Sequence, residues 1–267
     1  MKNVLLLVHD DPGQEARFQA ALDLTRALTG HLICLDVAEV PNLYGDPYVG
    51  TGAQAQLAAE IEGVEAANRV RLEARLARED VAWTWLDVTG TIAALLEEHS
   101  KTVDLIVVNR KLDNWALQDM RGIAAEVIVE SRKAVVAVPE KSRGFKVTGK
   151  ALIAWNGSDE VMKAVQQVIP LLQAAADVAV LEIEEETSIS VEEVASYLSR
   201  HGIRPEVVKA EKGSGSIADT IIAAAETQGA DYIVMGGFGH SRFLEAVIGG
   251  VSREMLGESP LPIVMSH

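Results

Sequence analysis

The chain has 267 residues, 48% of them hydrophobic, and a formal net charge of −15 at pH 7. This length and apolar content allow one large domain or two of ordinary size. The acidic balance argues against non-specific nucleic-acid binding, which depends on Lys and Arg side chains that neutralise phosphates. No apolar run approaches the roughly 18 residues of a membrane-spanning helix. The first residues indicate a strand and not a signal peptide. The single cysteine, Cys34, excludes an internal disulfide framework. We therefore expect a soluble, cytoplasmic protein with neither a membrane nor a nucleic-acid partner.

Strand-like and helix-like runs alternate along the first half of the chain. Short apolar runs predict strands at 4–8, 31–37, 82–87, 104–108 and 134–138. Amphipathic segments predict helices at about 14–29, 53–79, 90–100 and 120–131. Because the strand runs are nearly all apolar, both faces of the sheet should be covered by helices. The pattern predicts a doubly wound α/β fold, whose ligands bind at the carboxyl ends of the strands where strand order reverses.

The second half repeats this plan. The segments 3–8, 104–108, 122–128 and 134–138 match 150–155, 231–235, 250–256 and 262–265. A period of this size indicates a domain duplication and not a short solenoid repeat. We place one domain at 1–143 and the other at 144–267, joined within the polar, glycine-bearing segment 140–149.

The most informative motif follows the strand-like run Asp231–Met235. Glycines stand at Gly236 and Gly239, and after a further insert the chain continues with Gly249–Ser252. Glycines directly after a strand let a ligand approach the backbone closely. The N–H groups of such a loop and of the following helix start are free donors that suit phosphate. His240 lies inside this loop and could contact a phosphate, although a partly exposed loop residue is the favoured interpretation.

The spacing Gly, two residues, Gly, nine residues, Gly resembles the nucleotide-binding signature of the universal stress protein family. The resemblance covers both halves, so it implies two tandem Rossmann-like, adenine-nucleotide alpha hydrolase-like domains that form a pseudo-dimer. It also implies that the last strands, 134–138 and 262–265, pair across the interface. The ligand implied is ATP or a related adenine nucleotide, with Mg²⁺ as a candidate companion ion. The residues that would hold it are Ala154, Trp155, Asn156, Ile183, Met235, Gly236, Gly239, His240, Gly249, Gly250, Val251 and Ser252.

This sequence departs from the family pattern at several positions. Asn156 stands where the family has an acid, and Gly250 stands where a hydroxyl residue often follows the third glycine, with the hydroxyl displaced to Ser252. The first half lacks the motif, because the run 109–112 contains no glycine and Arg121 occupies the position of Gly249. Side chains should fill the phosphate space there, so we expect nucleotide only in the second half.

The predicted function is nucleotide binding by a stress-response or signalling module, with an unknown protein partner and self-association through the terminal strands, as in a homodimer. The sequence shows no convincing general base or metal cluster, so no catalytic residue is assigned and at most slow ATP hydrolysis is expected. One alternative is an interaction protein without nucleotide, in which the glycines only fix the backbone. Another is a small ligand in the first half, for which the insert Pro41–Gln56 is the candidate site. A third, an adenylating or pyrophosphatase-type enzyme, lacks the expected phosphate-loop and histidine motifs.

Overall fold

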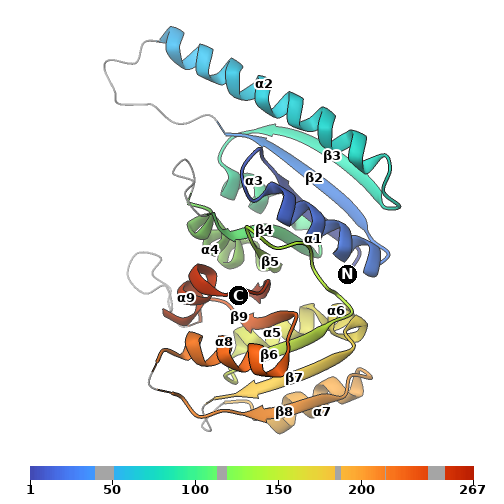
Figure 1. Ribbon diagram of the computed structural model, residues 1–267, viewed down its shortest axis with the longest axis vertical. Coiled ribbons are helices and arrows are strands. Elements are labelled where there is room, and N and C mark those ends of the chain that lie inside the picture. Colours follow the sequence, from blue (N-terminus) through green and yellow to red (C-terminus); the bar gives the residue numbers. More distant parts are fainter. Residues whose placement is uncertain (40–50, 113–118, 184–187, 214, 240–249) are drawn as a thin grey trace.

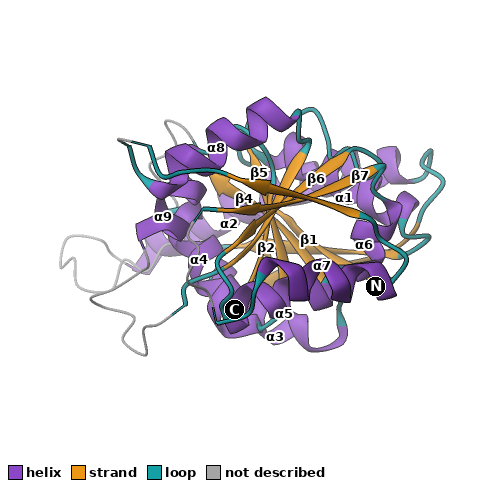
Figure 2. Cartoon of the chain, turned by 90° about the horizontal axis from the view of Figure 1, so that it is seen from below, coloured by secondary structure: helices purple, strands orange, loops and turns teal. Residues whose placement is uncertain are grey.

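The computed structural model describes residues 1–39, 51–112, 119–183, 188–213, 215–239 and 250–267, without the side chains of 51–55, 57 and 58. The strands of the first half are β1 Asn3–Val8, β2 His31–Ala38, β3 Ala82–Thr89, β4 Leu105–Lys111 and β5 Ala134–Pro139. Those of the second half are β6 Lys150–Trp155, β7 Asp177–Glu182, β8 Pro205–Lys209, β9 Tyr232–Gly236 and β10 Ile263–Ser266. Together they form one twisted sheet that runs through both halves (Figures 1 and 2).

The order of this ten-stranded sheet is β3-β2-β1-β4-β5-β10-β9-β6-β7-β8. Each half therefore has the same internal order, and the two halves meet at β5 and β10 like two subunits of a dimer. Neighbouring strands are parallel within each half, whereas β5 and β10 are antiparallel, with Val136 opposite Val264. The prediction that the last strands pair across the interface is confirmed, as is the doubly wound α/β class.

Helices cover both faces of the sheet (Figure 2). One face carries α1 Gln14–Ala27, α2 Thr51–Leu76, α5 Asp159–Gln167, α6 Ile169–Ala174 and α7 Val191–Arg200. The other carries α3 Ile92–His99, α4 Met120–Ser131, α8 Ile217–Gln228 and α9 Gly250–Glu258, with the 3-10 turn η1 Ser100–Thr102 after α3. None of the described helices is both long and apolar enough to cross a bilayer.

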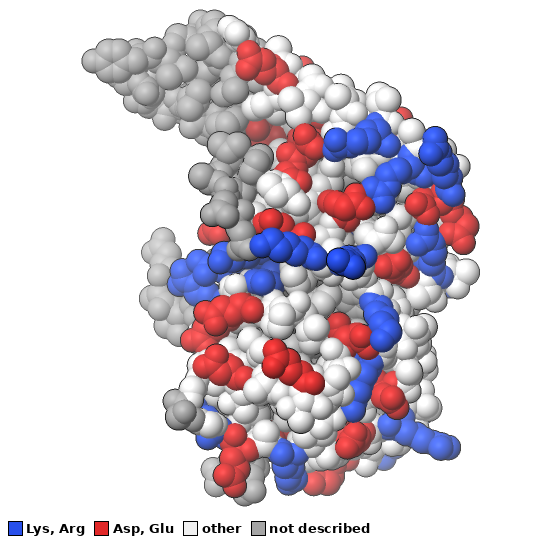
Figure 3. All heavy atoms as spheres, in the orientation of Figure 1, with Lys and Arg blue, Asp and Glu red and all other residues white. Residues whose placement is uncertain are grey.

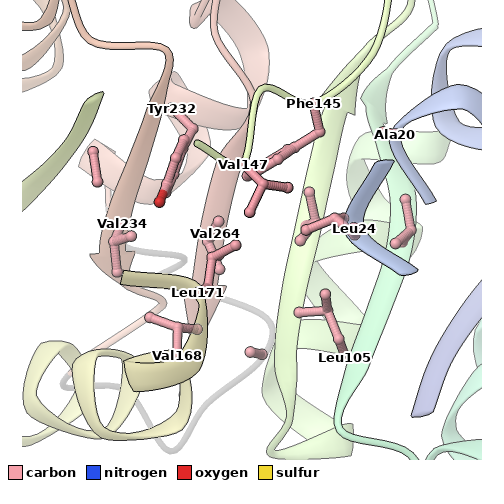
Figure 4. Packing of buried hydrophobic residues seen from close by; sticks show 14 of the residues in the cluster. Ala20, Leu24, Leu105, Phe145, Val147, Val168, Leu171, Tyr232, Val234 and Val264 are labelled. Carbon is pink, nitrogen blue, oxygen red and sulfur yellow. The ribbon is translucent and has the colours of Figure 1, made fainter. Parts of the chain in front are cut away.

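The apolar core on each face contains residues of both halves. The segment between β5 and β6 takes part in it: Phe145 and Val147 are buried, and the Phe145 ring centroid lies 4.8 Å from that of Tyr232 (Figure 4). Polar composition predicted this segment as a join, and the boundary proposed at 143/144 falls within it. Its two apolar side chains fix it onto the core.

The predicted elements differ from the observed ones mainly at their ends. β3 continues to Thr89, and the following helix begins only at Ile92 because Thr91 is still extended, with a ψ of 133°. α2 begins at Thr51 and ends at Leu76, where 53–79 was expected. Cys34 is buried in β2, as predicted, and burial raises its pKa to about 12. The insert 41–56 lies largely outside the described residues.

Charged groups are spread over the surface. On the face shown in Figure 3, acidic and basic side chains are interspersed over both halves, although the chain as a whole is strongly acidic. Among the residues described on this face, no field of a single sign points to a particular macromolecular partner.

Candidate functional site

A cavity of about 250 Å³ lies at the carboxyl ends of β6 and β9. These strands are neighbours, and from them the chain continues in opposite directions across the sheet, to β7 and to β10. The cavity therefore occupies the place where doubly wound sheets bind their ligands. It is lined by Ala154, Trp155, Asn156, Ser158, Glu160, Ile183, Ile217, Ile221, Met235, Gly236, Gly239, Gly250, Val251 and Ser252.

The structure gathers ten of the twelve predicted site residues around this one cavity. The other two, His240 and Gly249, lie outside the described residues. Sequence reasoning did not assign Ser158, Glu160, Ile217 and Ile221 to the site. The two isoleucines belong to α8, which begins after the Gly-Ser run at 213–216, and their spacing of four residues could have marked a helix face turned towards the site.

The cavity is lined by both apolar and polar groups. Ala154 and Met235 end the two strands, Ile183 follows β7, and Ile217 and Ile221 project from α8. The polar lining side chains are Asn156, Ser158, Glu160 and Ser252. An apolar pocket with a few well-placed polar groups is typical of small-molecule sites.

The three described glycines of the motif differ in their surroundings. A Cβ at Gly236 would lie 2.6 Å from the backbone nitrogen of Val161, so this glycine allows α5 to pack on the end of β9. A Cβ at Gly239 would lie 3.0 Å from Oε2 of Glu160, the far end of a flexible side chain. At Gly250 no described atom lies within 4 Å of such a Cβ. Gly236 is therefore needed for packing, whereas Gly250 leaves space open at the cavity.

The start of α9 is tied to the glycine loop. The backbone N–H of Phe238 donates to the Ser252 Oγ over 3.1 Å, and both residues are buried. Phe238 has a φ of 56°, a left-handed conformation that side-chain-bearing residues seldom adopt. The first N–H groups of a helix have no acceptor within the helix, so those of Gly250–Ser252 are available to a ligand anion at the cavity.

Comparison with known proteins places this site in a family. The family model described as universal stress protein family matches residues 148–267, which contain the whole cavity. The second half of the chain is a universal stress protein domain.

Similar proteins and structures extend over the whole chain. A universal stress protein of Synechocystis sp. is 21% identical, with 99% of each sequence covered. The crystal structure of a universal stress protein from Archaeoglobus fulgidus DSM 4304 has a TM-score of 0.72 at 14% identity, covering 99% of this chain and 95% of the other. A protein of unknown function from Pseudomonas aeruginosa PAO1 gives a TM-score of 0.56 at 13% identity, covering 100% and 92%. With the same strand order in both halves, the whole chain is similar in fold to tandem proteins of the universal stress type.

Asn156, the departure at the end of β6, serves a turn. Its Oδ1 accepts a hydrogen bond from the backbone N–H of Ser158 over 3.2 Å. Ser158 in turn caps α5, because its side chain accepts from the backbone N–H of Val161. With its oxygen engaged, Asn156 keeps its amide N–H groups as donors for a ligand.

In the first half, side chains fill the corresponding place of the universal stress fold. Arg17 is completely buried, and its guanidinium donates to Asp11 Oδ1 and Asn109 Oδ1, both over 2.6 Å, and to two backbone carbonyls. A Cβ at Gly13 would lie 2.4 Å from Cδ2 of Leu112. In the repeat, Asn109 and Leu112 correspond to Gly236 and Gly239. The side chains expected to fill the phosphate space of this half are present.

Proposed function

We propose that this universal stress protein binds ATP or a related adenine nucleotide in its second half. The observation that carries the proposal is the cavity at β6 and β9, which is lined both by apolar side chains and by the first turn of α9. The adenine ring would lie against Ala154, Ile183 and Met235, and the phosphates would extend to the backbone N–H groups of Gly250–Ser252. The helix dipole of α9 favours negative charge at that end.

The size of the cavity is consistent with the adenosine part of the ligand lying inside it and the phosphates lying outside. Its volume of about 250 Å³ is close to the lower end of the range of about 300–1,000 Å³ for small-molecule sites. This space suits a nucleoside, while the phosphates would occupy the open rim beside Gly250. Local backbone donors matter here, because a net charge of −15 opposes an anionic ligand.

Occupancy of the site, and not turnover, would be the signal in a stress response. α9 runs from the cavity to the first half, where Nη1 of Arg110 donates to the carbonyls of Leu256 and Gly257 over 3.1 and 2.6 Å. In the glycine loop, a Cβ at Gly237 would lie 2.7 Å from Cγ2 of Ile128 in α4. Nucleotide binding could therefore alter the surface that both halves offer to a protein partner.

Self-association is part of the same proposal. Within the chain, β5 and β10 pair with each other and each has a second neighbouring strand. This pairing joins the two halves in the way that two single-domain subunits would form a dimer. Two whole chains would have to associate through another surface. The outer strands of the sheet, β3 and β8, are the available edges for such pairing.

The test is a calorimetric titration of ATP–Mg²⁺ and of adenosine into the native protein and two matched variants. Gly250→Val places a side chain in the open space at the cavity, whereas Gly63→Val does so in α2, where a Cβ also meets no described atom within 4 Å. Both changes replace a helical glycine by a better helix former. We expect Gly250→Val to weaken ATP binding at least about tenfold and Gly63→Val to leave it unchanged. Absence of ATP and adenosine binding by native protein freed of endogenous nucleotide would contradict the proposal.

A second candidate is an interaction protein without nucleotide. It is favoured by the close approach of protein atoms, and not open space, to Gly236 and Gly239. In this reading both glycines only allow α5 to approach β9. The ratio of absorbance at 260 and 280 nm of the purified protein distinguishes the two, because a retained nucleotide raises it.

A further inference from the structure

One carboxylate occupies an unexpected place in the candidate nucleotide site. Glu160 lies in the first turn of α5, is half-buried and lines the cavity. Its Oε2 is the described atom nearest to the position that a Cβ on Gly239 would take, at 3.0 Å. The acid therefore stands beside the glycine that opens the loop towards a phosphate.

The charge of Glu160 is uncompensated in the part of the chain that the structure describes. No hydrogen-bond or ion-pair partner of its carboxylate is found there, and neither Lys nor Arg is among the described residues lining the cavity. A nucleotide phosphate chain at this rim would face a like charge across a short distance in a partly desolvated site, where repulsion is stronger than in water. Among the described residues, the backbone donors of α9 and the Asn156 amide would have to offset that repulsion.

The internal repeat indicates that this acid is particular to the half with the cavity. In the first half the position equivalent to Glu160 is Gly13, which packs directly against Asn109 and Leu112. The two halves differ in opposite ways at these positions. The second half has glycines in the loop after β9 and an acid in α5. The first half has larger side chains after β4 and a glycine just before α1. Where the space is open, a carboxylate lines it.

We propose that Glu160 makes the site selective for the Mg²⁺ complex of the nucleotide over the free nucleotide anion. Its carboxylate would bind the cation directly or accept hydrogen bonds from the water molecules around it. The cation would then lie between the Glu160 carboxylate and the nucleotide phosphates, and its attraction to both would replace their mutual repulsion. This inference rests on the proposed nucleotide site and assigns Glu160 as its specificity-determining residue.

The ligand chemistry of the site suits this cation. Mg²⁺ keeps several waters and is usually held by one or two carboxylates together with substrate phosphates, not by a cage of protein ligands. Among the described residues no group of three or more His, Cys, Asp or Glu side chains could hold a metal ion. A single acid beside a phosphate position is the arrangement that makes metal binding depend on the nucleotide.

The experiment compares three proteins with three ligands. Native protein, Glu160→Gln and Asp159→Asn are each titrated with ATP plus Mg²⁺, ATP plus a chelator, and adenosine. Asp159 is the matched control, because it is an exposed acid in the same helical turn that does not line the cavity. Thermal unfolding confirms that each variant is folded.

We expect chelation to weaken ATP binding to native protein by about tenfold or more. Glu160→Gln should bind metal-free ATP more tightly than native protein does and lose most of the difference between the two conditions. Asp159→Asn should behave as native protein, and adenosine should bind all three equally. With Mn²⁺ as the probe, the enhancement of water-proton relaxation in the protein–ATP complex should fall in Glu160→Gln.

Two results separate failure of this inference from failure of the proposed function. If native protein binds ATP equally with and without Mg²⁺, or if Glu160→Gln keeps the full dependence, the role of Glu160 is overturned and the nucleotide site stands. If native protein binds neither ATP nor adenosine under any condition, the nucleotide site itself is wrong and the inference falls with it.

Discussion

At the scale of single residues, the first half contains a buried polar cluster beneath α2. Asp36 is 4% exposed, and its Oδ1 has no hydrogen-bond partner among the described residues. Burial raises the pKa of Asp36 to about 7, and the charges of Glu65 and Asp87 act in the same direction, against the charge of Arg69. Asp36 therefore takes up a proton near neutral pH, where an ordinary aspartate is ionised.

The pKa of His9, in the same cluster, is shifted in the same direction. Its Nδ1 lies 2.9 Å from Oε1 of Glu65. Burial lowers the pKa of His9, but the hydrogen bond and the charge of Glu65 outweigh it, and the pKa rises above the ordinary 6.5. Both groups bind protons more tightly in the folded chain than in the unfolded one.

This cluster predicts that stability falls as pH rises towards and through neutrality. A folded pKa above the unfolded value contributes stability that is complete below the unfolded pKa, 3.8 for Asp36, and is lost as pH rises through about 7. We expect Asp36→Asn to flatten the fall in unfolding free energy between pH 4 and pH 8, as measured by urea denaturation. Asp177→Asn, at an exposed position of β7, is the control. Equal slopes in native protein and Asp36→Asn would show that Asp36 does not carry the effect.

At the scale of elements, α9 is held at both ends by different halves of the chain. Its first turn lines the cavity and receives the Phe238 N–H on Ser252, whereas its last carbonyls accept from Arg110 at the end of β4. A cation at a helix C-terminus is favourable because the terminal carbonyls have no partners within the helix. The order of α9, and with it the geometry of the cavity, therefore depends on the first half.

We expect Arg110→Met to loosen α9 by about 1 kcal/mol, in the range for partly buried cations at helix ends. Hydrogen exchange of the amides of residues 250–258 should become faster, and ATP binding should weaken in parallel. Arg253→Met, at an exposed position of the same helix, should change neither quantity. Unchanged exchange in Arg110→Met would mean that the contacts between α4 and α9 suffice to hold the helix.

At the scale of the whole molecule, the two halves share one sheet and one core. The β5–β10 ladder is continuous from Val135 to Ala137, and apolar clusters on both faces cross it. Phe145 and Tyr232 reinforce the junction from the connecting segment. Neither half can expose its terminal strand without leaving an unpaired, apolar edge.

Scanning calorimetry of the full chain should therefore show a single transition, with equal calorimetric and van't Hoff enthalpies. Saturating ATP–Mg²⁺ should shift that transition as a whole to higher temperature, because a ligand of the folded state stabilises the entire cooperative unit. Two resolved transitions, with only one of them moved by the nucleotide, would show that the halves unfold independently.

The sequence by itself determined the fold class and most of the described site. Apolar runs at 4–8, 104–108 and 134–138 alternate with amphipathic segments, and this local pattern sets a parallel, doubly wound sheet because each strand must be covered on both faces. The glycine spacing after Met235 carried the family resemblance, and that resemblance named the ten described residues that line the cavity. They lie together because strand ends in such a sheet meet at one edge.

Only the tertiary structure decided what surrounds those glycines. Ile217 and Ile221 line the cavity from α8, a helix that the sequence motif did not assign to the site. Glu160 lies beside Gly239 because α5 packs on the end of β9. The filling of the first-half site by Arg17 likewise depends on acceptors from β1 and β4, far apart in sequence. Local patterns specify which elements form, but contacts between side chains of distant elements depend on how those elements pack. The cavity, the position of Glu160 beside it and the filling of the equivalent space in the first half are therefore properties of the folded chain.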